Sequence, residues 1–239
     1  MTATIAAARP ARSDATAAGD GIAVAVFDLD QTITRADTFV RFLIGCLLRS
    51  PARWRHAPAL AWAVLAYASG RRDNNWLKAF FLRRIVGGRS PARLQRFVDA
   101  YVEQVLARQL LPAALAEIGR LRRSGVGLVL ATASPDLYVT PLGRRLGFDE
   151  IVCTRVGALA DGRCSGRLDG DNCYGEEKKR RIETLLAARG VSLRDVAFYS
   201  DHHSDLPLLQ AAGRPVAVNP TPKLAAYART AGIPMLDWR

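Results

Sequence analysis

Residues 24–32 have the sequence Val-Ala-Val-Phe-Asp28-Leu-Asp30-Gln-Thr32, an apolar strand that ends in two carboxylates. Two like charges held one residue apart raise each other's pKa unless a cation or a proton neutralises them. This stretch therefore predicts a bound metal ion and acid–base chemistry at the carboxyl end of a buried strand. A solvated turn with an aspartate cap is the alternative, and an isolated Asp-x-Asp pair does not distinguish the two.

Three segments downstream also place polar groups at strand ends or helix starts. An apolar strand is predicted over 126–131, an amphipathic helix over 176–189 and another strand over 195–199. The polar residues at these places are Thr132, Ser134, Lys178, Asp201 and Asp205. Ligands of open α/β sheets bind at the carboxyl ends of the strands, so we expect these groups to share one crevice.

Periodic patterns divide the chain into a tail, a core and an insert. After residue 125, predicted strands alternate with helices, which indicates a parallel sheet covered by helices on both faces. Between the first strand and residue 124 the pattern is helical throughout. We therefore predict an α/β fold, a Rossmann-like parallel sheet core with an inserted all-helical cap. The predicted parts are a disordered tail over 1–21, a core over 22–34 and 125–239, and a helical cap over 35–124.

Hydrophobic periodicity and turn residues place the individual elements. Strands are predicted over 23–27, 126–131, 195–199 and 215–218, with a short strand pair over 151–157 and 163–168 that turns at Asp161-Gly162. Helices are predicted over 37–49, 57–69, 74–86, 91–110, 112–123, 136–146, 176–189, 204–212 and 222–231.

The net charge of +12 is concentrated in the predicted cap. Residues 35–124 contain 17 Lys and Arg against 5 Asp and Glu, whereas the rest of the chain has 17 of each kind. A charge excess is usually a solvated face. An excess confined to one part of the chain favours an anionic partner, either a nucleic acid or an acidic lipid surface.

Two segments of the predicted cap are unusually apolar. Residues 57–70 contain no charged side chain, and residues 39–48 are interrupted only by Arg41. Fourteen residues are too few to span a bilayer, which needs about 20. A short helix that is apolar on all sides lies either in a protein core or in lipid. The two segments are therefore expected to form either a hairpin in the membrane interface or part of the cap interior.

Cysteine usage and the first residues indicate a cytoplasmic protein. The four cysteines form no Cys-x-x-Cys pair and have no histidine at metal-binding spacing, so neither a zinc site nor a disulfide framework is expected. Residues 1–21 are rich in Ala, Thr and Arg and lack a continuous apolar run, which fits neither a secretory signal nor a transit peptide. We expect a cytoplasmic location, with peripheral binding to the inner face of the membrane if the cap meets lipid.

The motifs Asp-x-Asp-x-Thr, Thr, Lys and Asp-x-x-x-Asp, in this order over residues 22–239, resemble those of the haloacid dehalogenase-like (HAD) phosphatases, specifically the phosphoserine-phosphatase-like branch. The resemblance implies that Asp28 attacks phosphorus to form an aspartyl-phosphate. It implies that Asp30 protonates the leaving group and then activates water. It also implies a Mg²⁺ site formed by the side chain of Asp28, the backbone carbonyl of Asp30 and Asp201.

The same resemblance assigns roles to further residues. Lys178 and Thr132 are expected to bind the phosphoryl oxygens, with Lys179 as the competing lysine. Asp205 is expected to orient Lys178 or a metal-bound water. The supporting residues are Thr32, Ser134 and Asp205.

Two departures from the family pattern concern the substrate. Phosphoserine phosphatases have a glutamate where this chain has Asp37, so Asp37 is expected either to contact the substrate or only to cap a helix. Ser200 and His202 stand where many relatives have glycines. His202 or His203 is expected either to reach the substrate or to be a bystander.

The sequence therefore predicts a Mg²⁺-dependent phosphomonoester hydrolase. The apolar, basic cap beside this catalytic set resembles phosphatidylglycerophosphatase C within the same branch, which implies a membrane lipid phosphate such as phosphatidylglycerol phosphate as substrate. The alternative is a soluble ester such as phosphoserine or histidinol phosphate. A receiver-type phosphoacceptor module is disfavoured because receivers lack a 90-residue helical insert. Nucleic-acid binding is disfavoured because the sequence has no aromatic and basic strand motif and no reading helix. The oligomeric state is not predicted.

Overall fold

The computed structural model describes residues 21–239. The predicted disordered tail over 1–21 therefore lies, except for its last residue, outside the described residues. None of the described helices is both long enough and apolar enough to cross a membrane.

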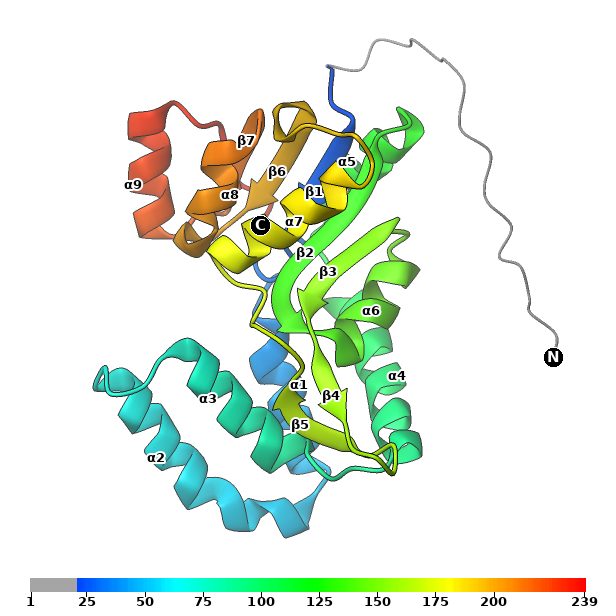
Figure 1. The fold of residues 1–239 in the computed structure, drawn as a ribbon, viewed down its shortest axis with the longest axis vertical. Helices are drawn as coiled ribbons and strands as arrows, with labels where there is room; N and C mark the ends of the chain where they lie inside the picture. Colours follow the sequence, from blue (N-terminus) through cyan, green and yellow to red (C-terminus); the bar gives the residue numbers. More distant parts are fainter. Residues whose placement is uncertain (1–20) are drawn as a thin grey trace, which may run out of the picture.

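Six parallel strands form one sheet in the order β3-β2-β1-β6-β7-β8 (Figure 1). The strands are β1 (Val24–Phe27), β2 (Gly127–Pro135), β3 (Glu150–Thr154), β6 (Val196–Ser200), β7 (Arg214–Val218) and β8 (Met235–Leu236). Within β1, Phe27 pairs with Leu130 of β2 on one side and with Tyr199 of β6 on the other. Segments that follow these three strands therefore meet at one edge of the sheet. The predicted Rossmann-like parallel sheet is confirmed.

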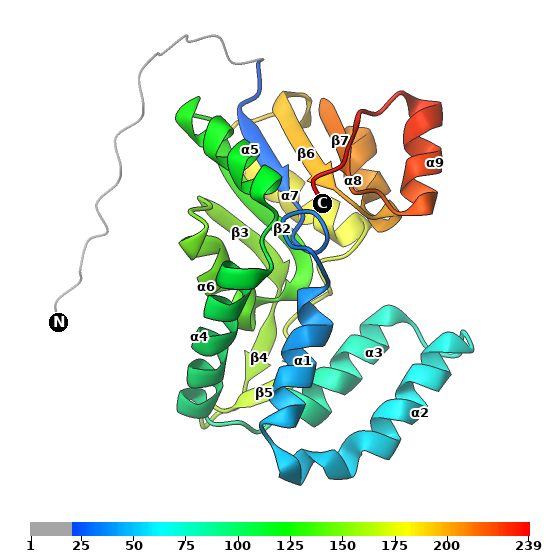
Figure 2. The ribbon, with the colours of Figure 1, turned by 180° about the vertical axis from the view of Figure 1, so that it is seen from behind.

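Helices cover both faces of the sheet because its central strands are apolar on both sides. Ala25 and Phe27 of β1 belong to one buried cluster, and Val24 and Val26 belong to another. The covering helices are α5 (Pro112–Arg123), α6 (Asp136–Arg145), α7 (Glu176–Ala187), α8 (Leu206–Ala211) and α9 (Pro222–Ala231). The first cluster includes α5 and α6, which lie in front in Figure 2, and the second includes α7, α8 and α9.

A helical insert separates β1 from β2 and forms the lower part of the molecule in Figure 1. It contains α1 (Thr38–Leu48), the 3₁₀ segment η1 (Pro51–His56), α2 (Ala57–Ala68), α3 (Asn74–Phe81), the π-helical turn η2 (Leu82–Val86) and α4 (Pro91–Arg108), followed by α5. Aspartates fix two of the starts, since Asp37 accepts a hydrogen bond from Val40 N and Asp73 accepts one from Trp76 N. Because α5 contacts β2, we propose that the cap extends from α1 through α4.

The insert differs from the prediction in three respects. The helix expected over 74–86 changes from α to π geometry after Phe81. The segment η1 was not predicted, and the guanidinium of Arg53 holds it by donating to the carbonyls of Arg84 and Gly87. The expected hairpin of two apolar helices is wrong as a pairing, because α2 packs chiefly against α3 while α1 packs against α4 and η2.

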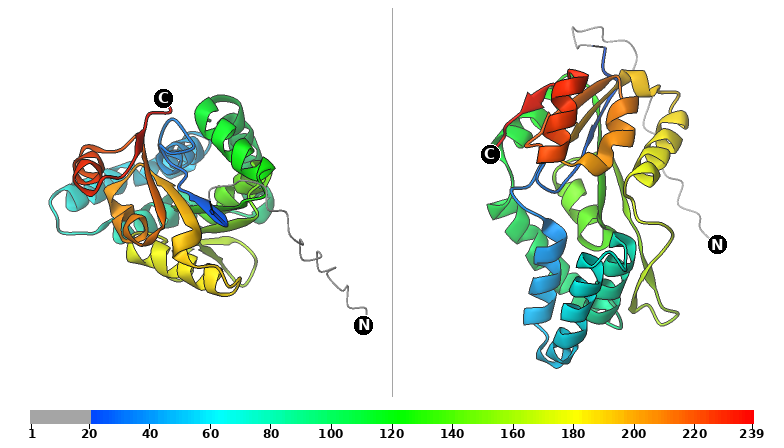
Figure 3. Two further views of the ribbon diagram at one scale, coloured as in Figure 1. Left: turned by 90° about the horizontal axis from the view of Figure 1, so that it is seen from above. Right: turned by 90° about the vertical axis from the view of Figure 1, so that its left-hand side faces the viewer.

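The predicted strand pair over 151–157 and 163–168 is also divided differently. β3 joins the main sheet, whereas the next strand, β4 (Val156–Ala158), pairs antiparallel with β5 (Cys164–Leu168). Polar contacts explain the break at Arg155, since the Thr154 hydroxyl donates to the Ala133 carbonyl and the Asp136 carboxylate accepts from Val156 N. The two-stranded sheet contacts α3 and η2, so it packs against the helical insert (Figure 3).

Candidate active site

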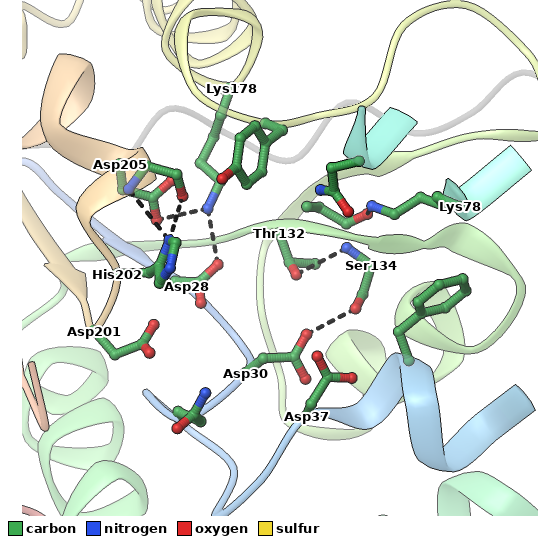
Figure 4. Close-up of a pocket in the computed structure, with 16 residues that line it drawn as sticks. Asp28, Asp30, Asp37, Lys78, Thr132, Ser134, Lys178, Asp201, His202 and Asp205 are labelled. Atoms are coloured by element: carbon green, nitrogen blue, oxygen red, sulfur yellow. Dashed lines mark hydrogen bonds and ion pairs between the residues drawn. The ribbon is translucent and has the colours of Figure 1, made fainter. Parts of the chain in front are cut away.

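A pocket opens at the carboxyl ends of β1, β2 and β6 and is also lined by residues of the helical insert (Figure 4). It is lined by all of the predicted catalytic, phosphate-binding and metal-binding residues: Asp28, Asp30, Thr132, Lys178 and Asp201. Ser134, Asp205, Asp37 and His202 also line it. Sequence segments more than 170 residues apart are brought together because their strands are neighbours in the sheet.

Lys178 is a buried cation held between two carboxylates. Its Nζ lies 2.8 Å from Asp28 Oδ1 and 2.8 Å from Asp205 Oδ2, and Ser200 Oγ donates to the same oxygen of Asp205. Burial alone would lower the pKa of Lys178, but the carboxylates of Asp205 and Asp28 raise it well above its ordinary value. Lys178 therefore carries a positive charge at neutral pH, beside one oxygen of Asp28.

The backbone before α7 sets the position of this lysine. Gly175 precedes the helix with φ 59° and ψ −127°, a conformation that residues with a Cβ rarely adopt. Three residues later, Lys178 points into the pocket, whereas Lys179 lies on the outer side and approaches Glu183 at 3.8 Å. Of the two lysines considered from the sequence, the structure thus brings Lys178 to the site.

Asp30 is held by different partners from those of Asp28. Its Oδ1 accepts a hydrogen bond of 2.6 Å from the backbone N–H of Thr38, and its Oδ2 accepts one of 2.8 Å from Ser134 Oγ. Burial, with a smaller contribution from Asp37, raises the pKa of Asp30 to about 6. A carboxyl group with a pKa near neutrality suits both donation and acceptance of a proton.

Thr132 lies opposite Asp28, in the last part of β2 and three residues before its end at Pro135 (Figure 4). Its Oγ1 accepts a hydrogen bond from Ser134 N at 3.1 Å, so the hydroxyl proton is left to donate to a ligand in the pocket. The pocket thus combines a carboxylate beside an ammonium group, a second carboxyl near neutral pKa and a hydroxyl donor.

Residues 25–210 match the haloacid dehalogenase-like hydrolase family. The chain belongs to this family. Among its relatives, Protein CicA of Caulobacter vibrioides is 34% identical over 193 residues, which cover 78% of this chain and 81% of that protein. Phosphoserine phosphatase SerB1 of Mycobacterium tuberculosis is 28% identical over 223 residues, which cover 92% of this chain and 72% of that protein.

Solved structures share the fold of this HAD-like hydrolase. A Bordetella pertussis protein of unknown function matches with a TM-score of 0.80 and 27% identity, covering 90% of this chain and 98% of that one. A phospho-aspartyl intermediate analogue of phosphoserine phosphatase matches with a TM-score of 0.65 and 16% identity, covering 91% of this chain and 94% of that one. Family, relatives and fold agree that this chain is a HAD-like hydrolase with the fold of phosphoserine phosphatases.

The carboxylates of this HAD-like hydrolase fit a divalent cation, which phosphatases of the family generally use. Burial raises the pKa of Asp28 to about 7 and, with the charge of Asp28, that of Asp201 to about 8. Five aspartates line the pocket (Asp28, Asp30, Asp37, Asp201 and Asp205) against two lysines, Lys78 and Lys178, so carboxyl groups outnumber ammonium groups there. The side chains of Asp28 and Asp201 and the carbonyl of Asp30 offer the all-oxygen ligands that Mg²⁺ prefers.

This candidate ligand set includes only two carboxylate side chains. Across residues 21–239, no group of three or more His, Cys, Asp and Glu side chains is arranged to hold a metal ion. The candidate set of Asp28, Asp201 and the Asp30 carbonyl is not such a group, because its third ligand is a backbone oxygen. The four cysteines are buried and free.

Of the remaining candidate residues, some line the pocket and others do not. Asp37 both caps α1 and lines the pocket, so the two roles considered for it are compatible. His202 lines the pocket and contacts Ser204 Oγ at 2.8 Å through Nδ1, whereas His203 does not line the pocket. The hydroxyl of Thr32 is buried without a hydrogen-bond partner among the described residues and also lies outside the lining.

A buried polar network beneath the cap was not anticipated from the sequence. Lys78 of α3 donates 2.7 Å hydrogen bonds to the Ala133 carbonyl and to Asn172 Oδ1, and Asn172 Nδ2 donates to Asn75 Oδ1. The network joins the cap to Ala133, in the last part of β2 between Thr132 and Ser134. One signal in the sequence could have found it, because Lys78 is the only lysine among the 17 basic residues of 35–124.

Lys78 is expected to make stability depend on pH. Burial lowers its pKa from 10.5 to about 8, so the unfolded chain binds more protons than the folded one between these pH values, and stability rises with pH there. Relative to a Lys78→Met variant, the unmodified protein should gain about 2 kcal/mol between pH 8 and pH 10. Urea unfolding of both proteins at the two pH values measures this difference. An unchanged or reversed difference would contradict the assigned burial of the ammonium group.

Proposed function

We propose that this phosphatase hydrolyses phosphomonoesters through a covalent aspartyl-phosphate on Asp28. The observation that carries the proposal is that two neighbouring carboxyl groups have different bonding partners. Asp28 is paired with Lys178, whereas Asp30 is bound by a backbone N–H and a hydroxyl and has a pKa raised to about 6. One group is thus suited to act as a nucleophile and the other as an acid and base.

In the first step, an oxygen of Asp28 forms a bond to phosphorus while the bond from phosphorus to the ester oxygen breaks. Asp30 donates its proton to that departing oxygen. Lys178 and the hydroxyl of Thr132, which line the same pocket, would neutralise and bind the phosphoryl oxygens. The reacting group is thereby held against Asp28, and an alcohol leaves.

In the second step, Asp30 accepts a proton from water as the water oxygen attacks phosphorus. The bond between phosphorus and Asp28 then breaks, which releases phosphate and restores the carboxylate. Mg²⁺, held by Asp28, Asp201 and the carbonyl of Asp30, would supply positive charge to the phosphoryl oxygens. Ser134 keeps Asp30 oriented through both steps by its 2.8 Å hydrogen bond.

For the substrate, we propose a phosphate monoester carried by a membrane lipid, such as phosphatidylglycerol phosphate. The support comes from the cap, where α2 exposes apolar side chains and arginines lie on both sides of it in the sequence. With such a substrate, the enzyme would act peripherally on a membrane. Phosphoserine or another soluble ester is the second candidate, favoured by the similarity to SerB1 and by the carboxylate of Asp37 in the pocket.

Phosphate release from a substrate panel tests both levels of the proposal. The panel contains phosphatidylglycerol phosphate in vesicles, phosphoserine, histidinol phosphate and p-nitrophenyl phosphate, each with Mg²⁺. We expect the highest kcat/KM for the lipid ester. The Asp28→Asn variant should release no phosphate from any substrate of the panel. Preference for a soluble ester would replace the lipid substrate, and failure to hydrolyse any phosphomonoester would contradict the proposed function.

A further inference from the structure

Helix α2 exposes apolar side chains over most of its surface. It contains no charged residue, and only Leu60, Ala63 and Ala66 are buried. These three are spaced three residues apart and form the narrow side that packs against α3. The exposed fractions of the large residues are 54% for Trp62, 47% for Val64, 69% for Leu65 and 44% for Tyr67. Soluble surfaces rarely gather so many apolar side chains, so this one calls for a partner.

The position of α2 leaves this surface accessible. In Figure 1, α2 lies at the outer edge of the cap, with α3 between it and the sheet. The preceding segment η1 continues the surface, since Trp54 is 54% exposed while its indole N–H donates to the Leu47 carbonyl. The hydrogen bond fixes a tryptophan on the outside of the protein, as is typical of side chains at a membrane interface.

The charged residues closest to α2 along the chain are arginines. Residues 38–72 contain six arginines and no Asp or Glu. Arg55 precedes α2, while Arg71 and Arg72 follow it, and all three are exposed. The nearest carboxylates in the sequence, Asp37 and Asp73, are both engaged in capping helices. An apolar helix with cations at both ends matches a surface that is apolar beneath a layer of anionic groups.

We propose that α2 and η1 form a docking face for an anionic lipid bilayer. A helix of twelve residues is about 18 Å long, too short to cross the bilayer, so it lies in the plane of the interface. Trp62 and Leu65 enter the boundary between headgroups and acyl chains. Arg55, Arg71 and Arg72 contact lipid phosphates at the two ends.

The charges favour a bilayer over a second copy of the chain or a nucleic acid. Two copies that met through α2 would bring their arginines together without carboxylates from 38–72 to pair with them. A nucleic acid would leave the apolar middle of the surface uncovered, because the cations stand only at its ends.

Docking through α2 would also place the substrate pocket near headgroups, a consequence that rests on the proposed function. Arg71 and Arg72 lie just before Asn74, which begins α3 and lines the pocket. A headgroup phosphate bound by these arginines is thus close along the chain to the rim of the site. The docking itself does not depend on catalysis.

Co-sedimentation with vesicles tests the docking face. The full chain is mixed with phosphatidylcholine vesicles that contain increasing phosphatidylglycerol, and three variants are compared with it. Trp62→Ser with Leu65→Ser should weaken binding about tenfold or more, and Leu65→Ser alone should act in the same direction without removing the contact of Trp62 with Trp76. Arg71→Gln with Arg72→Gln should weaken binding about fivefold for each arginine and reduce its salt dependence.

The matched control is Leu115→Ser with Leu159→Ser, two exposed apolar positions outside α1 to α4. It should bind vesicles like the unmodified protein, and all variants should hydrolyse a soluble phosphate ester equally if they fold. Hydrolysis without vesicle binding at any composition would overturn the docking face while leaving the phosphatase intact. Equal binding by the α2 variants would also overturn it, as would a dimer that the Trp62 and Leu65 substitutions dissociate. Vesicle binding without hydrolysis of any phosphate ester would instead contradict the proposed function and support the docking face.

Discussion

Asp28→Asn is expected to abolish phosphate release, with kcat reduced by about 10⁴-fold or more. The amide has nearly the shape of the carboxylate but cannot attack phosphorus. The variant should remain folded, because burial raises the pKa of Asp28 to about 7 and so disfavours its charged form in the folded protein. Lys178 also keeps Asp205 as a partner at 2.8 Å. Phosphate release and thermal unfolding, measured on the same preparation, give the two results.

Asp30→Asn is the control for this substitution. It should lower turnover by about 10² to 10⁴-fold, since it removes the proton donor, yet it leaves the nucleophile in place. Beryllofluoride, which mimics a phosphoryl group on a carboxylate, should therefore still bind Asp30→Asn but not Asp28→Asn. Normal turnover by Asp28→Asn would exclude it as the nucleophile.

Removal of divalent cations is expected to stop catalysis. Five aspartates line the pocket against two lysines, and the pKa values of Asp28 and Asp201 are raised to about 7 and about 8. A divalent cation would restore both groups to their charged forms and draw the phosphoryl oxygens toward Asp28. Phosphate release should fall to background in excess chelator and return with added Mg²⁺.

Asp201→Asn provides a matched test of the metal site. Loss of one carboxylate ligand should raise the Mg²⁺ concentration needed for half of full activity by about tenfold or more. The effect should be smaller for Ser204→Ala, which changes a pocket residue outside the candidate ligands. Full activity in chelator, or recovery with Zn²⁺ alone, would contradict a magnesium site.

The sheet, and the pocket that brings the main candidate residues together, could be predicted because each depends on a local pattern. An apolar run followed by Asp28 marks a buried strand with a polar end, and similar runs precede Thr132 and Asp201. Parallel pairing then brings the three ends together without further information, since it follows from the order of strands and helices. The same reasoning predicted most of the helix bounds in the insert.

Contacts between distant side chains could not be predicted in this way. Lys78 donates a hydrogen bond to Asn172, 94 residues further along the chain, in the loop between β5 and α7. No local pattern around Lys78 encodes this partner. The pairing of α2 with α3 depends on the turn at Ser69–Asp73 and on Trp76, which packs edge-on against Trp62. An apolar pattern on all sides of α2 gave no information on which side would be buried.

The arrangement of Asp28, Lys178 and Asp30 leads to one central claim, that phosphate passes through a covalent bond to Asp28. Acid quenching during turnover, followed by peptide mass spectrometry, tests it most directly because acyl phosphates survive in acid long enough to be located. The account predicts a phosphoryl group on Asp28 that is absent from Asp28→Asn and accumulates in no other peptide. A phosphoryl group on another residue, or phosphate release without any covalent species under conditions that trap acyl phosphates, would contradict it.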